Sequence, residues 1–318
     1  MANYILKRLL QLIPLLAGIT FLSFALMRLA GGDAVTYLYE NAGAAVPEEV
    51  IAAARAEYGL DRPFLVQYLS WLSGMVTGDM GVSYVSGQDV FDTMVSKLPA
   101  TLLLTASSLM TTLLLALPLG ILAAVRRGSW ADRLIRFFGF AGNAMPNFFA
   151  ALVLMYFFSI RLGWLPVITS ENLAASLVLP TLTLALSMAS KYTRQIRAAV
   201  LEELNQDYVT GARARGVRES VIIRKSVLKA SMLSILPLLA LSVGSLLGGT
   251  AIVETIFMWD GVGKMAVDAI LMRDYPVILA YVVWLSIIYV IFNLITDILY
   301  HYLDPHENTL NNRCSAEQ

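Results

Sequence analysis

Charged residues are scarce in this sequence, and their absence is concentrated in long stretches. Asp, Glu, Lys and Arg make up 14% of the 318 residues, against about 25% in an average soluble domain. A helix needs about 20 apolar residues to cross a membrane, and soluble core helices are usually amphipathic. We therefore predict an all-α integral membrane protein with six transmembrane helices. The six uncharged runs are Leu9–Met27, Leu98–Val125, Phe137–Ile160, Asn172–Ser190, Ala230–Val253 and Tyr275–Thr296.

Cysteine and histidine are almost absent, which excludes most metal and redox sites. Cys314 is the only cysteine, so no disulfide forms within the chain. His301 and His306 do not share a helical face, which favours interfacial residues over metal ligands. The sequence also lacks a phosphate-binding G-x-x-x-x-G-K-[ST] loop and an H-E-x-x-H pair. We therefore predict no catalytic, cofactor or metal residue in this chain.

The six runs also lack an ionisable group that would carry a coupling ion. Proton- and sodium-driven transporters usually hold an acid or base inside their spans, although backbone carbonyls at broken helices also bind sodium. An ion-gradient-driven transporter or a channel subunit is therefore the disfavoured alternative. Without a nucleotide site or an ion-coupling site, the chain needs energy from another subunit. Its net charge of zero points to no nucleic-acid partner.

The positive charges predict the orientation in the membrane. Basic residues are retained on the cytoplasmic side. Sixteen of the 23 Lys and Arg residues lie before the first run, between the second and third, between the fourth and fifth, or after the sixth. The chain is therefore predicted to lie in the inner membrane with both termini facing the cytoplasm. The first run is longer than the apolar part of a signal peptide, so we expect it to be a retained helix.

We divide the chain into four parts. Residues 1–30 form the first transmembrane helix, and residues 31–97 form an external segment. Residues 98–302 form a five-helix core with a cytoplasmic loop at 191–229, and residues 303–318 form a cytoplasmic tail. Within the external segment, Pro47 before two acids predicts a helix start. A stop at Gly59 and a second helix over Phe64–Met75 complete a small helical cap.

Proline and glycine interrupt the apolar runs. Pro118, Pro146, Pro180 and Pro237 are expected to kink their helices, and such kinks persist where neighbouring helices or a water-lined cavity satisfy the backbone. Small residues at Gly244, Gly248 and Gly249 allow close helix packing. General helix packing is a sufficient explanation for any one of these prolines and glycines. Taken together, they favour a helix bundle that changes conformation.

The cytoplasmic loop contains a short segment suited to docking. A set of residues recurs at roughly helical spacing, small residues follow at 211, 212 and 214, and Gly216 would end the helix. The set is Ala198, Leu201, Glu202, Asn205, Tyr208 and Val209. An amphipathic helix seated in a partner's groove is a standard recognition mode. A solvated basic loop that only sets topology is the alternative.

Asp207–Val217, read as DYVTGARARGV, resembles the cytoplasmic coupling motif of ABC importer permeases, in the form found in the dipeptide, oligopeptide, glutathione and nickel group. Thr210, Gly211, Ala212 and Gly216 stand where the general motif has Glu, Ala, Ala and Gly. Further similar segments occur in order along the chain: Lys7–Leu10, Gly59–Pro63 with Gln67 and Tyr68, Leu98–Thr101, Met145–Phe148, Glu254–Phe257, Gly261–Gly263, Arg273–Ile278 and Leu303–Pro305.

The resemblance implies a type I ABC importer permease fold and a set of partners. These are a second homologous permease, two ATPase subunits that hold ATP and Mg, and an extracytoplasmic solute-binding protein. ATPase coupling would involve Asp207, Thr210, Gly211, Ala212, Arg213 and Gly216. Pro146, Gly244, Gly248 and Gly249 would serve helix packing or the pathway. Trp259, Asp260, Arg273 and Asp274 would face the binding protein.

The resemblance leaves the substrate open between a short peptide, glutathione and nickel or a metal chelate. The spans and external loops contain no histidine or cysteine, so this chain has no soft ligands for a metal. Gly248 and Gly249 are somewhat more typical of the nickel and glutathione members. The family usually has Trp-Pro-Gly where this chain has Trp259-Asp260-Gly261, and Asp260 adds an external charge there.

The predicted topology is tested by thiol labelling. Cys314 is first replaced by Ser, and Cys is then introduced as Ser86→Cys or Ser220→Cys. We expect an impermeant thiol reagent added to intact spheroplasts to label position 86 and not position 220, because basic residues mark the inside. Labelling of position 220 from outside would overturn the orientation.

Overall fold

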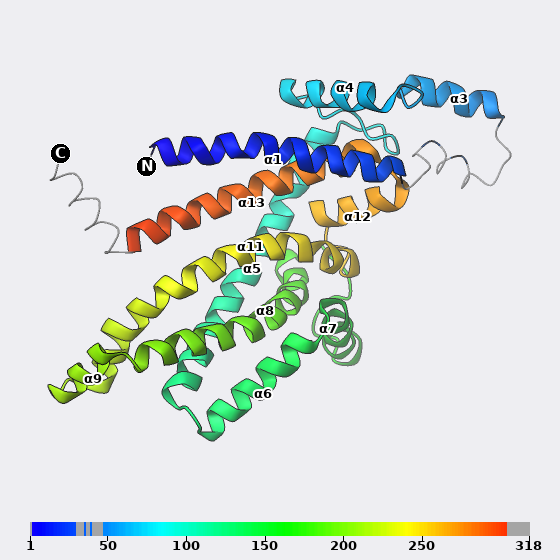
Figure 1. Cartoon of the computed structure of the whole chain (residues 1–318). Helices are drawn as coiled ribbons and strands as arrows, with labels where there is room; N and C mark the ends of the chain where they lie inside the picture. Colours follow the sequence, from blue (N-terminus) through cyan, green and yellow to red (C-terminus); the bar gives the residue numbers. More distant parts are fainter. Residues whose placement is uncertain (1, 30–34, 36–38, 40–46, 304–318) are drawn as a thin grey trace, which may run out of the picture. The chain divides into compact units, whose positions relative to one another are not determined.

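The computed structural model describes residues 2–29, 35, 39 and 47–303, without the side chains of 2–9, 12, 233, 234, 236–243, 245, 247–249 and 296–303. The described chain is helical (Figure 1), and its only β feature is one isolated bridge between Val82 and Asp89. The predicted all-α class is therefore confirmed. The predicted tail, with His306 and Cys314, lies almost wholly outside the described residues.

The helices follow one another along the chain as Figure 1 shows. They are α1 (Ala2–Leu29), α3 (Glu48–Glu57), α4 (Phe64–Thr77), α5 (Val90–Val125), α6 (Trp130–Ala144), α7 (Asn147–Leu154), the π-helix η1 (Met155–Arg161), α8 (Leu173–Leu204), α9 (Asp207–Ala214), α10 (Glu219–Ile222), the π-helix η2 (Ile223–Val227), α11 (Leu228–Ile256), α12 (Val262–Met272) and α13 (Tyr275–Leu303).

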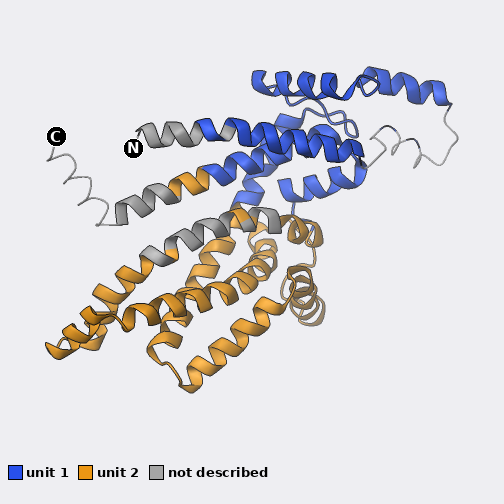
Figure 2. Cartoon of the chain, viewed as in Figure 1, with its two compact units in different colours: residues 1–102, 258–290 blue, residues 103–257, 291–318 orange. Residues whose placement is uncertain are grey.

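Contacts divide the chain into two compact units (Figure 2). Unit 1 contains residues 1–102 and 258–290, and unit 2 contains residues 103–257 and 291–318. Both α5 and α13 contribute to both units. The division of the chain into four parts made from the sequence stays a prediction.

The apolar runs correspond to long helices. Three helices in the described part of the chain are long and apolar enough to cross a membrane: Val90–Val125, Leu173–Leu204 and Tyr275–Ile295. A fourth span arises if α6 and the helix formed by α7 and η1, which meet at 105°, count as one broken span. Described residues of α1 form a shorter apolar helix, Ile13–Leu29, and many side chains of α11 lie outside the described residues. Six spans therefore stay a prediction.

The four prolines that were expected to kink their helices have two different settings. Helices α5, α8 and α11 continue without a break through Pro118, Pro180 and Pro237. The chain breaks only at Pro146 among these four prolines, where Met145 and Pro146 adopt extended backbone with ψ of 123° and 142°. The extended backbone at Met145 is the conformation that a residue before proline prefers. The predicted kinks at Pro118, Pro180 and Pro237 stay a prediction.

Unit 1 contains the predicted helical cap. Helix α3 begins after Pro47 and α4 ends at Thr77 with left-handed Gly78, so both cap helices are confirmed. Phe24 of α1, Tyr68 of α4 and Leu279 of α13 form one buried cluster. A second cluster joins the start of α5 to α12 and α13 through Met80, Val90, Met94, Val262, Ala269, Val277 and Ala280. These apolar contacts hold the cap against the helices of the same unit.

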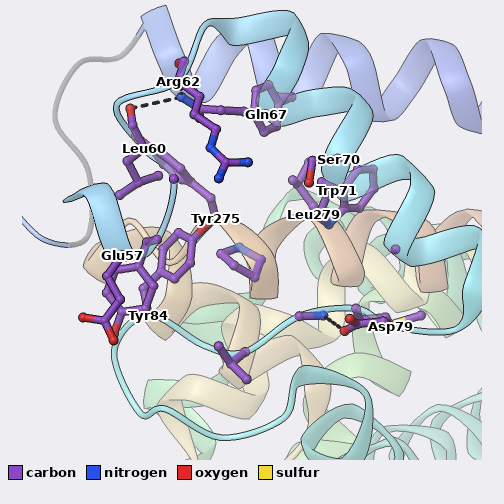
Figure 3. A pocket seen from close by; sticks show the side chains of 18 residues that line it. Glu57, Leu60, Arg62, Gln67, Ser70, Trp71, Asp79, Tyr84, Tyr275 and Leu279 are labelled. Carbon is purple, nitrogen blue, oxygen red and sulfur yellow. Dashed lines mark hydrogen bonds between the residues drawn. The ribbon is translucent and has the colours of Figure 1, made fainter. Parts of the chain in front are cut away.

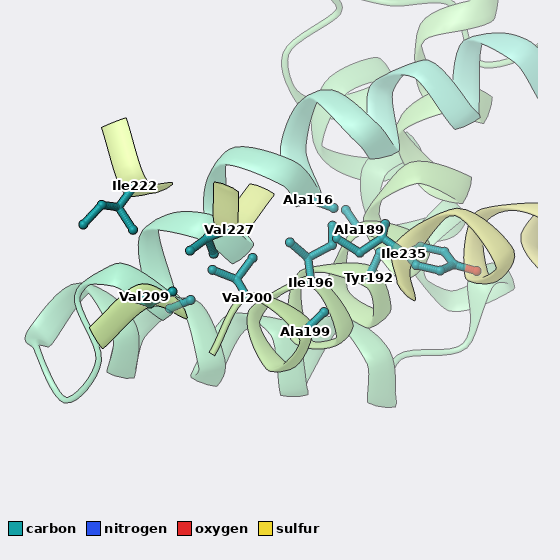
Figure 4. Close-up of a cluster of buried hydrophobic side chains, with 11 residues drawn as sticks. Ala116, Ala189, Tyr192, Ile196, Ala199, Val200, Val209, Ile222, Val227 and Ile235 are labelled. Carbon is teal, nitrogen blue, oxygen red and sulfur yellow. The ribbon is translucent and has the colours of Figure 1, made fainter. Parts of the chain in front are cut away.

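Unit 2 is built around α8, which packs against α6, α7 and α11. The main core contains Ile196 and Val200 of α8 with Ile235 of α11 and Ala116 of α5 (Figure 4). Gly120 permits α5 to approach α8 closely: a Cβ there would lie 2.8 Å from Ile196 Cβ and 3.0 Å from the Thr193 carbonyl oxygen. Because both of those atoms are held rigidly, the glycine is required by packing rather than by backbone conformation.

The close approach at Gly120 predicts a stability difference between two Gly→Ala variants. Gly120→Ala should lower the free energy of unfolding by about 1–3 kcal/mol, because the added methyl overpacks the α5–α8 contact. Gly18→Ala is the control, since nothing lies within 4 Å of its added Cβ and alanine favours a helix interior. Thermal midpoints of both purified variants provide the comparison, and equal midpoints would contradict the packing assignment.

Candidate functional sites in the two units

Helix α9 is attached to unit 2 by one deeply buried side chain. Val209 is fully buried in the core cluster that includes Val200, Ile222 and Val227 (Figure 4). Ala212, one turn later, is partly buried against the same cluster. The two residues are three apart and so lie on one helical face. A short helix with a buried apolar edge is therefore present as predicted, although the spacing read over residues 198–209 is divided between the end of α8 and α9.

The remaining faces of α9 are open. Asp207, Thr210, Gly211 and Arg213 are exposed, and a Cβ added at Gly211 would have no neighbour within 4 Å. Tyr208 is also exposed, so the open faces are not uniformly small, but another backbone can come close at Gly211. The structure thus places the six predicted coupling residues on or next to one short exposed helix.

Gly216 ends this helix in the way that the sequence predicted. Its φ of +75° is left-handed, which a β-branched side chain adopts only with strain. The Gly216 amide donates to the Arg213 carbonyl at 3.0 Å, and the Val217 amide donates to the Ala212 carbonyl at 3.2 Å. These two bonds form a Schellman motif, which satisfies carbonyls at the helix end.

An exposed ion pair joins α9 to α10. The Arg213 guanidinium donates to both Glu219 oxygens, at 2.6 and 3.0 Å. The hydrogen bond from Arg213 lowers the pKa of Glu219 and the same bond raises the pKa of Arg213. Both side chains are about half exposed, so solvent screens the pair and its contribution to stability is small. Arg213 therefore remains accessible to a partner surface.

A buried ion pair, of which the sequence gave no sign, links α6 to α8. Asp132 is 1% exposed and accepts two bonds from Arg197, at 2.7 and 3.0 Å. The Gly128 amide donates to the same carboxylate at 2.9 Å. In the sequence, Arg197 is one of the basic residues that indicate the cytoplasmic side. Nothing there pairs it with a residue 65 positions away. The pair fixes the half of α8 that leads into α9.

In unit 1, the loop before α12 is anchored by a buried tryptophan. Trp259 is 1% exposed, and its Nε1 donates to the Ala100 carbonyl at 3.0 Å. Asp260 beside it is exposed and pairs with Lys97. Asp260 therefore offers a charged group at the surface, whereas Trp259 holds the loop in place.

Asp274 has a similar anchoring position at the start of α13. It is 4% exposed and accepts hydrogen bonds from the Ser83 hydroxyl and from the Tyr84 amide, the latter at 3.1 Å. Burial raises the pKa of Asp274, while the bonds from Ser83 and backbone amides act in the opposite direction. Burial and the nearby Asp274 charge also raise the pKa of Tyr84 to about 12. Arg273, with left-handed φ of +57°, is the partly exposed neighbour.

A pocket of about 340 Å³ lies in unit 1 between the cap and the start of α13 (Figure 3). Arg62, Trp71 and Tyr275 project into it from three segments. Gln67 closes the turn before α4 by donating to the Leu60 and Arg62 carbonyls at 3.0 and 2.6 Å. The sequence indicated the turn but gave no sign of the pocket, because its lining comes from distant parts of the chain.

The predicted packing residues lie at separate positions in unit 2. Pro146 stands at the break between α6 and α7. Gly244, Gly248 and Gly249 lie in α11, where the surroundings of Gly248 and Gly249 are outside the described part of the chain. Their predicted packing or pathway role stays a prediction.

Two family comparisons cover most of the chain. Residues 116–308 match the family described as binding-protein-dependent transport system inner membrane component. Residues 1–105 match the N-terminal part of the binding-protein-dependent transport system membrane component. The C-terminal match includes α9, so the exposed coupling candidate lies inside the matched region.

Curated relatives are similar over nearly the full length. The chain is 40% identical to the oligopeptide transport system permease protein AppB of Bacillus subtilis, over 96% of this chain and 99% of that protein. It is 37% identical to the glutathione transport system permease protein GsiC of Escherichia coli K12, over 96% and 98% of the two chains.

Solved structures show the same fold. The chain resembles a chain of the MetNI methionine ABC transporter in an inward-facing conformation, with a TM-score of 0.55 and 19% identity. The likeness covers 66% of this chain and 96% of that one. An amino acid ABC transporter solved with histidines gives a TM-score of 0.52, at 15% identity and over 66% and 94% of the chains.

The contact between Ser83 and Asp274 predicts a pH-dependent effect of Ser83→Ala. The Ser83 hydroxyl stabilises the ionised carboxylate, so its loss should cost about 1–3 kcal/mol of unfolding free energy at pH 7. The loss should shrink as the pH falls through the raised pKa of Asp274, where the carboxyl becomes protonated. Thermal midpoints at pH 7 and at about pH 4 measure both values.

The control for this comparison is Ser96→Ala, because Ser96 is exposed and bonds only to the carbonyl of Thr93, at 2.8 Å. A Ser83→Ala effect that is equal at the two pH values, or no larger than that of Ser96→Ala, would show that the Ser83 contact does not depend on the ionised Asp274.

Proposed function

Because the chain belongs to the family of binding-protein-dependent transport system inner membrane components, we propose that it forms one half of the translocation pathway for a short peptide. The chain is the permease subunit of an ABC importer of the dipeptide and oligopeptide group. A second homologous permease would supply the other half. Two ATPase subunits would hold ATP and Mg, and a solute-binding protein would deliver the peptide from outside.

The observation that carries the proposal is the geometry of α9. One buried edge at Val209 fixes the helix to the core around α8 and α11, and its other faces are open. In this arrangement, a force applied to α9 by a closing ATPase passes through packed side chains to two long helices. ATP-driven closure would then shift the population between inward-open and outward-open states.

Peptide is favoured over nickel as the transported solute. The relatives at 40% and 37% identity are named for oligopeptide and glutathione transport. Among the described residues no cluster of three or more His, Cys, Asp or Glu could hold a metal ion. The leaning drawn from Gly248 and Gly249 was toward the nickel and glutathione members. Of these two substrates, the relatives named above support glutathione, which is itself a tripeptide.

Unit 1 would supply the surface for the solute-binding protein. Asp260 presents an exposed carboxylate before α12, and Arg273 follows at the other end of that helix. Buried Trp259 and Asp274 would shape the two ends of α12 rather than touch the partner. With six spans and both termini in the cytoplasm, this surface would face outward and α9 inward.

The coupling role is tested by Gly216→Val. Valine at φ of +75° is strained, at a cost of about 1–2 kcal/mol, and should distort the end of α9 without touching a long helix. We expect normal membrane insertion and normal pairing with the second permease, but weaker ATPase association and loss of uptake. Co-purification of the ATPase and peptide uptake are measured on the same preparation. Arg213→Glu, added in a second variant, reverses a charge on the same surface.

Gly163→Val is the matched control. Gly163 also has a left-handed φ, +64°, and its added Cβ also meets nothing within 4 Å, so the backbone strain is comparable while α9 is intact. If Gly216→Val keeps wild-type ATPase association and uptake, or if Gly163→Val impairs both equally, then α9 is not the coupling element.

A further inference from the structure

A pocket with a polar lining opens on unit 2 at the break between α6 and α7, and Asn143 and Lys191 are exposed at it. Its volume is about 200 Å³. Asn143 in the last turn of α6 and Asn147 at the start of α7 line it from either side of the break, and Ser187 and Lys191 line it from α8. Leu184, Met188, Tyr192 and Leu246 complete the lining.

The polar side chains of this cavity are not used by the fold. Within the part of the chain that is described, no hydrogen bond or ion pair joins the side chains of Asn143, Asn147 or Ser187 to another residue. Lys191 lies over the Tyr192 ring, 5.8 Å from its centroid, and none of the described carboxylates forms an ion pair with it. Other polar groups in the same helices do have partners: Ser190 bonds to the Leu186 carbonyl, and Arg197 bonds to Asp132.

These polar groups lie in an otherwise apolar part of the molecule. The same helices expose Phe140, Phe148, Phe149 and Leu152, side chains that suit a hydrocarbon environment. An amide or hydroxyl that faces lipid without a partner is costly, so polar groups in spans turn toward the bundle interior or toward water. A helix broken within a span also requires a lining of protein or water for its freed backbone groups. Both features place water or a polar solute at this cavity.

The chemistry of the lining identifies the solute. An ammonium group at Lys191 attracts a carboxylate, and asparagine and serine side chains donate to and accept from peptide groups. The cavity is smaller than the roughly 300–1,000 Å³ that encloses a drug-sized ligand, which fits the end of a peptide rather than all of it. The lining contains no acidic residue, so it lacks a partner for the peptide's amino end.

We propose that this cavity is a transit site for the carboxyl end of the peptide, in which Lys191 pairs with the α-carboxylate while Asn143, Asn147 and Ser187 hydrogen-bond the last peptide group. The inference rests on the proposed peptide import. It adds the residues that contact the peptide and the orientation in which the peptide is held.

The first experiment tests whether the cavity is wet and occupied by peptide. In the assembled transporter with Cys314→Ser, Ser187→Cys is treated with a small charged thiol reagent, with and without trialanine and loaded binding protein. We expect rapid labelling that trialanine slows, since water must reach the cavity and the peptide must cover it. Leu152→Cys, on an exposed apolar position, should react slowly in both conditions. The proposed site is overturned if Ser187→Cys reacts no faster than Leu152→Cys, or if trialanine does not slow its labelling.

The second experiment tests the Lys191 contact. Uptake of trialanine and of trialanine amide is compared in proteoliposomes that contain the complete transporter. Lys191→Gln should reduce the preference for the free acid by about tenfold, the size of one charge-assisted bond, and Lys191→Arg should restore most of it. The binding protein is the same in every preparation. Its own preference therefore cancels when the ratio of trialanine uptake to trialanine amide uptake is compared between variant and wild type. Arg127→Gln removes an exposed charge from the α5–α6 loop and should leave the ratio unchanged.

The outcomes separate this inference from the proposed function. If the wild-type transporter takes up peptide and Lys191→Gln lowers the uptake of trialanine and trialanine amide equally, only the carboxylate contact is overturned. No wild-type uptake of either peptide overturns peptide import itself. An effect of Lys191→Gln that vanishes in vesicles without anionic phospholipid would assign Lys191 to a lipid headgroup and would also overturn the proposal.

Discussion

Hydrocarbon cannot hydrogen-bond, and the organisation of this chain depends on that constraint. Long uncharged helices satisfy their own backbone groups, and the charged residues are left for their ends and connections. Where a charge is buried, as at Asp132 and Asp274, several donors surround it. The same constraint makes the break at Pro146 informative, because a broken helix must find partners for its freed groups in protein, water or solute.

Two kinds of attachment carry the proposed mechanism. Apolar burial holds α9 to the core through Val209, and hydrogen bonds from Ser83 and Trp259 hold the loops at the two ends of α12. In each case the anchoring residue is buried and a neighbouring residue is at least partly exposed, where the proposed partner would bind. Transport by alternating access needs such rigid connections, because a movement at a docking surface reaches the pathway only through groups that are packed together.

Local pattern made several features predictable from the sequence. The helical class, the start of α3 after Pro47 and the left-handed end of α9 at Gly216 each depend on neighbouring residues, so short-range rules suffice. Features that join distant residues escaped prediction: the Asp132–Arg197 pair, the contact from Ser83 to Asp274 and the cavity beside Lys191. Proline alone did not indicate where the chain breaks, since Pro118 and Pro180 lie within continuous helices whereas Pro146 stands at a break.

The central claim is that the open face of α9 touches an ATPase subunit. The most direct measurement is cross-linking from Gly211→Cys in a Cys314→Ser background, because a Cβ at position 211 meets no other described atom of this chain within 4 Å. A short thiol-to-amine linker should join position 211 to the ATPase in the assembled transporter, with a yield that changes when ATP binds. A yield no greater than that from Ser86→Cys, with and without ATP, would contradict the account.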